Sequence, residues 1–163
     1  MVYIHYTCGM EKLSPEEEFN QTMVREITSS CLLTRTRRIS RVVTNIFETE
    51  LRPYGINAPQ FSMLVLISRM GNASRAEIAR ENHQERSTST RNLQLILSEG
   101  WAEEISDETS GRRKPIRISQ AGKFILTAAM PAWRTAQAKT NQLLGETGAS
   151  AIGAMADNLP IEH

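Results

Sequence analysis

Two short stretches of the sequence combine guanidinium or ammonium groups with hydroxyls, which are side chains that bind anions and polar acceptors. The first stretch holds Arg86, Ser87, Thr88, Thr90 and Arg91, and the second holds Arg112, Arg113 and Lys114. Guanidinium groups bond phosphate oxygens and can bond guanine O6 and N7 in a bidentate manner, whereas hydroxyls can serve bases or phosphates. Both stretches could contact a polyanion if the fold places them on a common surface.

The other residues offer no catalytic arrangement. The sequence contains no Gly-rich phosphate loop, no His-Glu-x-x-His or Gly-x-Ser-x-Gly motif, and no carboxylates paired for acid-base work. The histidines are scattered at positions 5, 83 and 163, and Cys8 and Cys31 lack a metal-ligand spacing. We therefore expect no catalytic residues, no metal, no cofactor and no enzymatic activity. Two cysteines do not make a disulfide framework, so a cytoplasmic location is expected.

Length and composition narrow the class of protein further. The chain has 163 residues, of which 40% are hydrophobic and 23% charged, as in one globular domain with terminal additions. The longest apolar run covers residues 63–67, far below the ~20 residues of a membrane-spanning helix, so no membrane partner is expected. Because the net charge is only +1, the local placement of the cations must decide any attraction to nucleic acid.

The spacing of apolar residues predicts two helices in the first half of the chain. One long amphipathic helix is expected over residues 22–51, and Pro53 closes it. A second helix is expected to start after Asn57, a good N-cap residue, and to end at Gly71. Residues 61–67 are apolar on nearly all sides, which predicts that this second helix is buried.

A pair of short helices and a hairpin follow. Ser74 and Glu77 have the spacing of a capping box, and the next helix is expected over residues 87–99 with Gly100 at its C-terminus. Alternating residues predict strands at 101–105 and 116–118, joined by a turn-rich and then cationic tip. A long final helix is expected after Ser119, with a bend at Pro131 and a last short helix over residues 151–159.

This order of elements predicts a mainly α fold with a small β-hairpin wing, that is, a winged helix-turn-helix. The flanking N- and C-terminal helices carry apolar positions that need another surface, and a two-fold dimer supplies one. The expected division is an N-terminal extension over residues 1–21, a dimerisation helix over 22–56, the winged helix-turn-helix lobe over 57–119, and C-terminal dimerisation helices over 120–163.

Several short motifs occur in a characteristic order along the chain. They are residues 37–41 (RRISR), 51–56 (LRPYGI), 60–61 (QF), 76–79 (AEIA), 86–93 (RSTSTRNL), 100–101 (GW) and the basic stretch 112–122. In this order and spacing they make residues 25–160 resemble the MarR family of bacterial transcription regulators, which are dimeric winged-helix proteins.

The resemblance implies a homodimer that binds a pseudo-palindromic operator in double-stranded DNA, with repression released by a small-molecule effector. The second helix of the motif would enter the major groove, where Arg91 is expected to read guanine, and the hairpin tip would approach the minor groove. The expected DNA contacts are Arg86, Ser87, Thr88, Thr90, Arg91, Arg112, Arg113 and Lys114.

The resemblance also implies a crevice that takes a small aromatic or anionic effector. The arginines of the first helix could form an anion-binding wall there, or could instead pair with acids such as Glu48 and Glu50 across the dimer. Aromatic and Met residues could supply apolar walls, although at helical spacing such residues are more often core. The expected effector contacts are Arg38, Arg41, Tyr54, Phe61, Met63 and Trp133.

The sequence departs from the family pattern within the helix-turn-helix and the wing. Ser110 replaces an Asp that usually forms a salt bridge bracing the wing tip, and Asn82, Gln84 and Ser89 stand where apolar residues usually pack. These polar residues predict a looser core or a different packing. They leave open an alternative function, a winged-helix module that binds protein without specific DNA binding.

Cys31 raises a third function, that of a redox-sensing regulator. Such a role requires an accessible thiol with a depressed pKa. Arg35, one helical turn further on, could stabilise a thiolate. A buried cysteine would instead act as a small hydrophobic residue.

Overall fold

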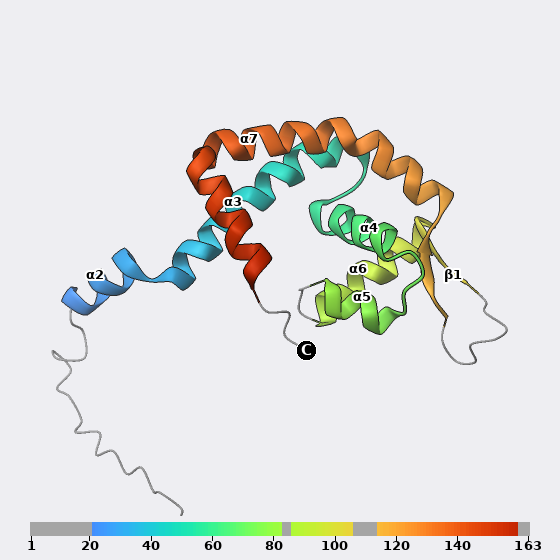
Figure 1. The fold of residues 1–163 in the computed structure, drawn as a ribbon, viewed down its shortest axis with the longest axis horizontal. Coiled ribbons are helices and arrows are strands. Elements are labelled where there is room, and N and C mark those ends of the chain that lie inside the picture. Colours follow the sequence, from blue (N-terminus) through green and yellow to red (C-terminus); the bar gives the residue numbers. More distant parts are fainter. Residues whose placement is uncertain (1–20, 83–85, 106–113, 160–163) are drawn as a thin grey trace, which may run out of the picture. The chain divides into compact units, whose positions relative to one another are not determined.

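The computed structural model describes residues 21–82, 86–105 and 114–159. The predicted fold class, mainly helical with a β-hairpin, is confirmed. In chain order the elements are α2 (Gln21–Ser30), α3 (Leu32–Leu51), the 3-10 turn η1 (Arg52–Tyr54), α4 (Ala58–Met70), α5 (Arg75–Glu81), α6 (Arg86–Ser98), β1 (Ala102–Glu104), β2 (Ile116–Ile118) and α7 (Gln120–Asn158) (Figure 1). The described residues divide into two units, with the boundary between Ser40 and Arg41. None of the helices in the described ranges has the length and hydropathy needed to cross a bilayer.

In the first unit the helix is interrupted at Cys31, between α2 and α3 (Figure 1). The prediction of one continuous helix over residues 22–51 was therefore wrong. The hydroxyls of Thr28, Ser29 and Ser30 donate hydrogen bonds to carbonyl oxygens three or four residues earlier, at 2.6–3.1 Å. Such bonds compete with the helical ladder and bend helices. The periodicity of apolar residues, on which the prediction relied, carries no information on these hydrogen bonds.

Helix α4 begins with a capping box at the predicted N-cap, Asn57. The Asn57 side chain accepts a hydrogen bond from the backbone N–H of Gln60 at 2.8 Å, and the Gln60 side chain accepts one from the Asn57 N–H at 3.0 Å. The Glu48 carboxylate accepts a third N–H, that of Ala58, at 3.0 Å. These bonds satisfy amides that the first turn of a helix leaves without partners.

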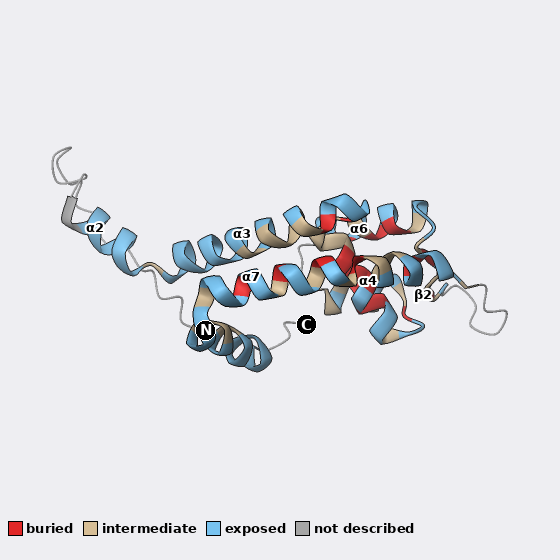
Figure 2. Ribbon diagram, turned by 90° about the horizontal axis from the view of Figure 1, so that it is seen from above, coloured by how far each residue is buried: buried red, intermediate tan, exposed pale blue. Residues whose placement is uncertain are grey.

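The core of the second unit is built around α4, which contacts α5, α6, α7 and β2. Residues 61–67 are buried as predicted, except Ser62 and Val65, which are exposed. Figure 2 shows the buried residues gathered on α4 and its neighbours. Further core residues are Leu51, Ile56, Ile78, Leu93, Ile96, Ile116, Ala129 and Ala132. The helix-turn-helix, the hairpin and the first part of α7 therefore share one core.

The hairpin is joined to the helix-turn-helix through its backbone. Strands β1 and β2 pair antiparallel, with Glu103 opposite Arg117. Ala73, just before α5, exchanges two hydrogen bonds with Ile116 of β2, at 2.7 and 3.1 Å. The residues that lead into α5 thus extend the sheet by one bridge and fix where the wing begins.

Helix α7 is anchored to the end of α6 by a close backbone approach. The predicted N-cap Ser119 accepts a hydrogen bond from the Gly122 N–H at 3.1 Å and donates one to the Gly100 carbonyl at 2.6 Å. A Cβ atom at Gly122 would lie 2.0 Å from the Trp101 carbonyl oxygen, so this approach requires glycine.

The helical dihedrals of α7 are interrupted at Gly145, where φ is 68° and ψ is 166°. That conformation is essentially restricted to glycine. Pro131, where the sequence predicted a bend, lies inside α7 with helical dihedrals. The glycine therefore marks the break between the two parts of α7.

Candidate nucleic-acid interface and ligand pocket

Helix α6 divides its residues between the core and the surface. Positions 89, 93 and 96 are buried, and this face packs into the core. The opposite side, at the start of the helix, exposes four of the predicted DNA contacts, namely Ser87, Thr88, Thr90 and Arg91. Phosphate and base edges are the acceptors that such hydroxyls and guanidinium groups bind in a groove.

The polar residues that depart from the family pattern form a pair inside the helix-turn-helix. The side-chain amide of Asn82, at the end of α5, donates a hydrogen bond to the hydroxyl of Ser89 at 3.2 Å. Ser89 is 1% exposed. Because a buried hydroxyl without a partner is costly, this bond allows a polar residue in the packed face of α6. The motif is therefore packed differently at this point, with a hydrogen bond in place of an apolar contact.

Two ion pairs hold the base of the wing. Arg75 of α5 donates to one Glu104 carboxylate oxygen of β1 from Nε at 3.0 Å and from Nη2 at 2.6 Å. Across the hairpin, Arg117 Nε donates to Glu103 at 2.7 Å. The first pair links the wing to the helix-turn-helix, and the second links its two strands. Sequence reasoning missed both, since nothing local signals a bond between residues 75 and 104.

A polar depression of about 510 Å³ lies where α5 meets the hairpin. Among the predicted DNA contacts it includes the exposed Lys114, and it adds Arg80, a cation that sequence reasoning did not single out. Its lining residues are Ser74, Arg75, Ala76, Glu77, Arg80, Glu104 and Lys114. Arg112 and Arg113 lie outside the described residues, as do Gln84 and Ser110, and of Arg86 only its place as the first residue of α6 is described.

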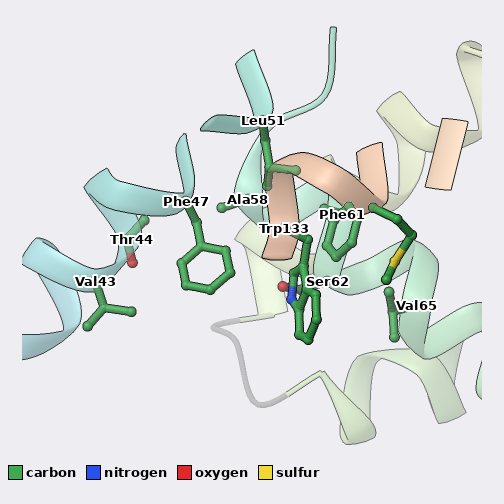
Figure 3. Close-up of a pocket in the computed structure, with 10 residues that line it drawn as sticks. Val43, Thr44, Phe47, Leu51, Ala58, Phe61, Ser62, Val65 and Trp133 are labelled. Atoms are coloured by element: carbon green, nitrogen blue, oxygen red, sulfur yellow. The ribbon is translucent and has the colours of Figure 1, made fainter. Parts of the chain in front are cut away.

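A second cavity, of about 590 Å³, lies between α3, α4 and α7 within the second unit. Figure 3 shows aromatic rings facing it from all three helices: Phe47 from α3, Phe61 from α4 and Trp133 from α7. The lining residues are Val43, Thr44, Phe47, Leu51, Ala58, Phe61, Ser62, Val65, Met130 and Trp133. We call this cavity the three-helix pocket. Its volume is typical of sites for small organic ligands.

The predicted effector residues are distributed unevenly around this pocket. Phe61 and Trp133 line it, Met63 is fully buried in the core, and Tyr54 lies in η1 outside the lining. Arg41 is exposed on α3 and is absent from the lining, and Arg38 is exposed in the first unit. Phe61 and Met63 are two positions apart on α4, and residues at that spacing point to different sides of a helix. Phe61 therefore faces the pocket, whereas Met63 faces the core.

The acids suggested as partners of the arginine cluster are engaged within the chain. Glu48 accepts the N–H of Ala58 at the start of α4, and Glu50 accepts from Lys139 Nζ of α7 at 2.5 Å. The pair between Glu50 and Lys139 ties α3 to α7 beside the three-helix pocket.

The half-buried Cys31 thiol has a pKa below its ordinary value, because the Thr34 side chain and then the Thr34 backbone hydrogen-bond to it. Arg35 is not the cause: its guanidinium donates to the carbonyl oxygen of Ser29. The described residues contain no group of three or more His, Cys, Asp or Glu side chains that could hold a metal ion.

Comparison with known proteins agrees with this architecture. A model of the MarR family matches residues 54–113, a range that includes α4, α5, α6 and β1. No protein of curated function matches the chain.

Three solved structures share the fold over most of their length. The transcriptional regulator MosR of Mycobacterium tuberculosis is 28% identical, with a TM-score of 0.64 over 80% of this chain and 98% of that chain. A mutant of Escherichia coli MarR in complex with operator DNA is 17% identical, with a TM-score of 0.72 over 83% and 98%. A MarR family protein of M. tuberculosis in complex with salicylic acid is 22% identical, with a TM-score of 0.63 over 80% and 97%.

The first of these proteins is a transcriptional regulator, and the second is bound to operator DNA. With the family model on residues 54–113 and the same winged helix-turn-helix architecture around them, the resemblance predicted from the sequence is confirmed. Residues 54–113 of this chain match the MarR family, and its winged helix-turn-helix has the fold of these solved structures.

Proposed function

We propose that this protein is a dimeric, sequence-specific regulator that binds a pseudo-palindromic operator in double-stranded DNA, and that it represses transcription until a small molecule releases it. The observation that carries the proposal is the exposed side of α6, where Arg91 and three hydroxyl residues stand opposite a buried face. The complex of an E. coli MarR mutant with operator DNA supports it.

The dimer is inferred from apolar side chains that remain exposed in the described residues. Ile27, Leu32 and Leu33 of the first unit, and Met155 and Leu159 at the end of the chain's second unit, are exposed to between 52% and 75%. Apolar side chains that gather on a surface mark protein interfaces. A two-fold dimer would cover it and would present two α6 helices to successive major grooves.

Release by an effector is inferred from the three-helix pocket. A ligand there would contact α3, α4 and α7 together, and α4 contacts α5 and α6 in turn. A ligand that favours one arrangement of these helices shifts the population between DNA-binding and released states. The salicylic acid complex of a M. tuberculosis MarR family protein supports a small-molecule effector.

The alternative of a protein-binding module is weakened by the pair inside the helix-turn-helix. That alternative rested on polar residues at apolar positions, and two of them, Asn82 and Ser89, hydrogen-bond to each other. They are compatible with a packed helix-turn-helix that positions α6. Specific DNA binding therefore remains the function we propose.

The test compares two arginine variants in binding to the intergenic DNA beside the protein's own gene. Arg91→Ala is expected to raise the Kd by about 5- to 150-fold, because a bidentate contact to guanine is worth about 1–3 kcal/mol. Arg134→Ala, which removes an exposed arginine of α7, is the matched control and should leave the Kd unchanged. Equal affinities of Arg91→Ala and the wild type would contradict the proposal.

A further inference from the structure

We propose that the three-helix pocket takes an uncharged, largely apolar ring compound and rejects ligands that carry a carboxylate. The inference rests on the proposed function, in which the occupant of this pocket is the effector, and names its chemical class. The sequence predicted an aromatic or an anionic effector, and the pocket favours an aromatic compound without a charge.

The composition of the lining carries the argument. Among the described residues, none that lines the pocket bears a charge. The polar side-chain groups are limited to the hydroxyls of Thr44 and Ser62 and the indole N–H of Trp133. Three aromatic rings and aliphatic side chains make up the rest (Figure 3). Such a wall solvates rings and alkyl groups, and it offers an orienting hydrogen bond to an ester, ketone or ether oxygen.

An anion would lose its hydration in this pocket without gaining a cation. Moving a carboxylate out of water is unfavourable unless it is paired and hydrogen-bonded. Arg41 lies two residues before the lining residue Val43, yet it is exposed and outside the lining. Lys139 of α7 is held by Glu50 at 2.5 Å and is also outside the lining. Neither of these two cations lines the pocket.

The size and position of the pocket suit a small ring compound. Its volume of about 590 Å³ lies within the range of about 300–1,000 Å³ that small-molecule sites occupy. Ser62 and Val65 are exposed residues of α4 at the pocket, so it opens to solvent on that side and a ligand can enter. Leu64 and Ile67, on the buried side of the same helix, belong to the core shared with α6.

The experiment uses the full chain and two probes that differ in charge, methyl 1-naphthoate and 1-naphthoate, titrated by isothermal calorimetry. The neutral ester is expected to bind at least about tenfold more tightly than the anion, a difference of about 1.4 kcal/mol. Ser62→Arg places a cation at the pocket and should improve binding of 1-naphthoate relative to the ester. Ser68→Arg is the matched control, because Ser68 is an exposed serine of the same helix outside the lining, and it should leave the ratio unchanged.

Several results would overturn the inference. They are equal affinity of the two probes for the wild type, binding of neither probe, or an unchanged ratio in Ser62→Arg. Operator binding is measured separately on the same preparations. If neither probe binds to protein that still binds operator DNA, the ligand class is wrong and the DNA-binding proposal stands. If the ester binds without weakening operator binding, the ligand class is upheld and the effector role is overturned.

Discussion

The side-chain amide of Asn82 donates a hydrogen bond to the buried hydroxyl of Ser89 at 3.2 Å, and so joins the end of α5 to the inner face of α6. The contact replaces apolar packing at the centre of the helix-turn-helix. It depends on both residues, because either side chain alone would leave a polar group without a partner.

Removing one member of this pair should destabilise the protein more than replacing both. Ser89→Ala is expected to lower the free energy of unfolding by about 1–2 kcal/mol, since it leaves the half-buried Asn82 amide unpaired. The double variant Asn82→Leu with Ser89→Ala should recover part of that loss, because two apolar side chains can pack together. Urea denaturation measures the free energy of unfolding of the single and the double variant. Additive losses in the double variant would show that the pair is not coupled.

The ion pair between Arg75 and Glu104 is expected to position the wing for DNA. Glu104→Gln should weaken operator binding while changing the free energy of unfolding by less than about 1 kcal/mol, as exposed pairs contribute little stability. If only the loss of a negative charge mattered, Glu104→Gln would bind DNA more tightly, because the repulsion from phosphates would be smaller. Glu103→Gln breaks the pair within the hairpin and keeps the link to α5, so its effect on affinity should be smaller. Tighter binding by Glu104→Gln would refute the positioning role.

The lowered pKa of Cys31 predicts alkylation at unusually low pH. In a Cys8→Ala background, the rate of reaction with iodoacetamide should reach half its maximum at a lower pH than for a cysteine in an unfolded peptide. Thr34→Val removes the main cause and should raise this midpoint. Thr36→Val, whose hydroxyl bonds the Leu32 carbonyl, should leave it in place. An identical midpoint in the wild type and Thr34→Val would disprove the assignment.

The contact between Gly122 and the Trp101 carbonyl predicts a strong response to a single methyl group. Gly122→Ala should lower the free energy of unfolding by about 1–3 kcal/mol, the usual cost of overpacking, because backbone atoms must move. Gly153→Ala is the control in the same helix, where a Cβ meets nothing within 4 Å and alanine favours the helix by about 1 kcal/mol. Equal melting temperatures of Gly122→Ala and Gly153→Ala would argue against the close approach of Gly122 to the Trp101 carbonyl.

The features that the sequence predicted correctly are those encoded within a few residues. The caps at Asn57, Ser74 and Ser119 depend on side chains that bond the amide three positions ahead, and the buried run in α4 depends on nearly continuous apolar character. The break at Cys31 was missed because helical periodicity continues through it, while hydroxyl groups compete for the carbonyls.

The features that escaped prediction join residues that are distant in the chain. The bond between Arg75 and Glu104 and the bond between Glu50 and Lys139 connect separate elements, and no local pattern signals either. The lining of the pocket was predicted only in part, at Phe61 and Trp133, for a similar reason. Aromatic and Met residues on helices could be core or wall, and only the packing of α3, α4 and α7 separates the buried Met63 from the pocket-lining Phe61.

The most direct test of the central claim is the binding of the purified wild-type protein to the intergenic DNA beside its own gene. Binding is measured against random DNA of equal length at about 50 mM and about 200 mM salt. Our account predicts saturable binding that is tighter than binding to random DNA and that weakens as salt rises. Binding no tighter than to random DNA at either salt concentration would contradict it and would favour a protein-binding module.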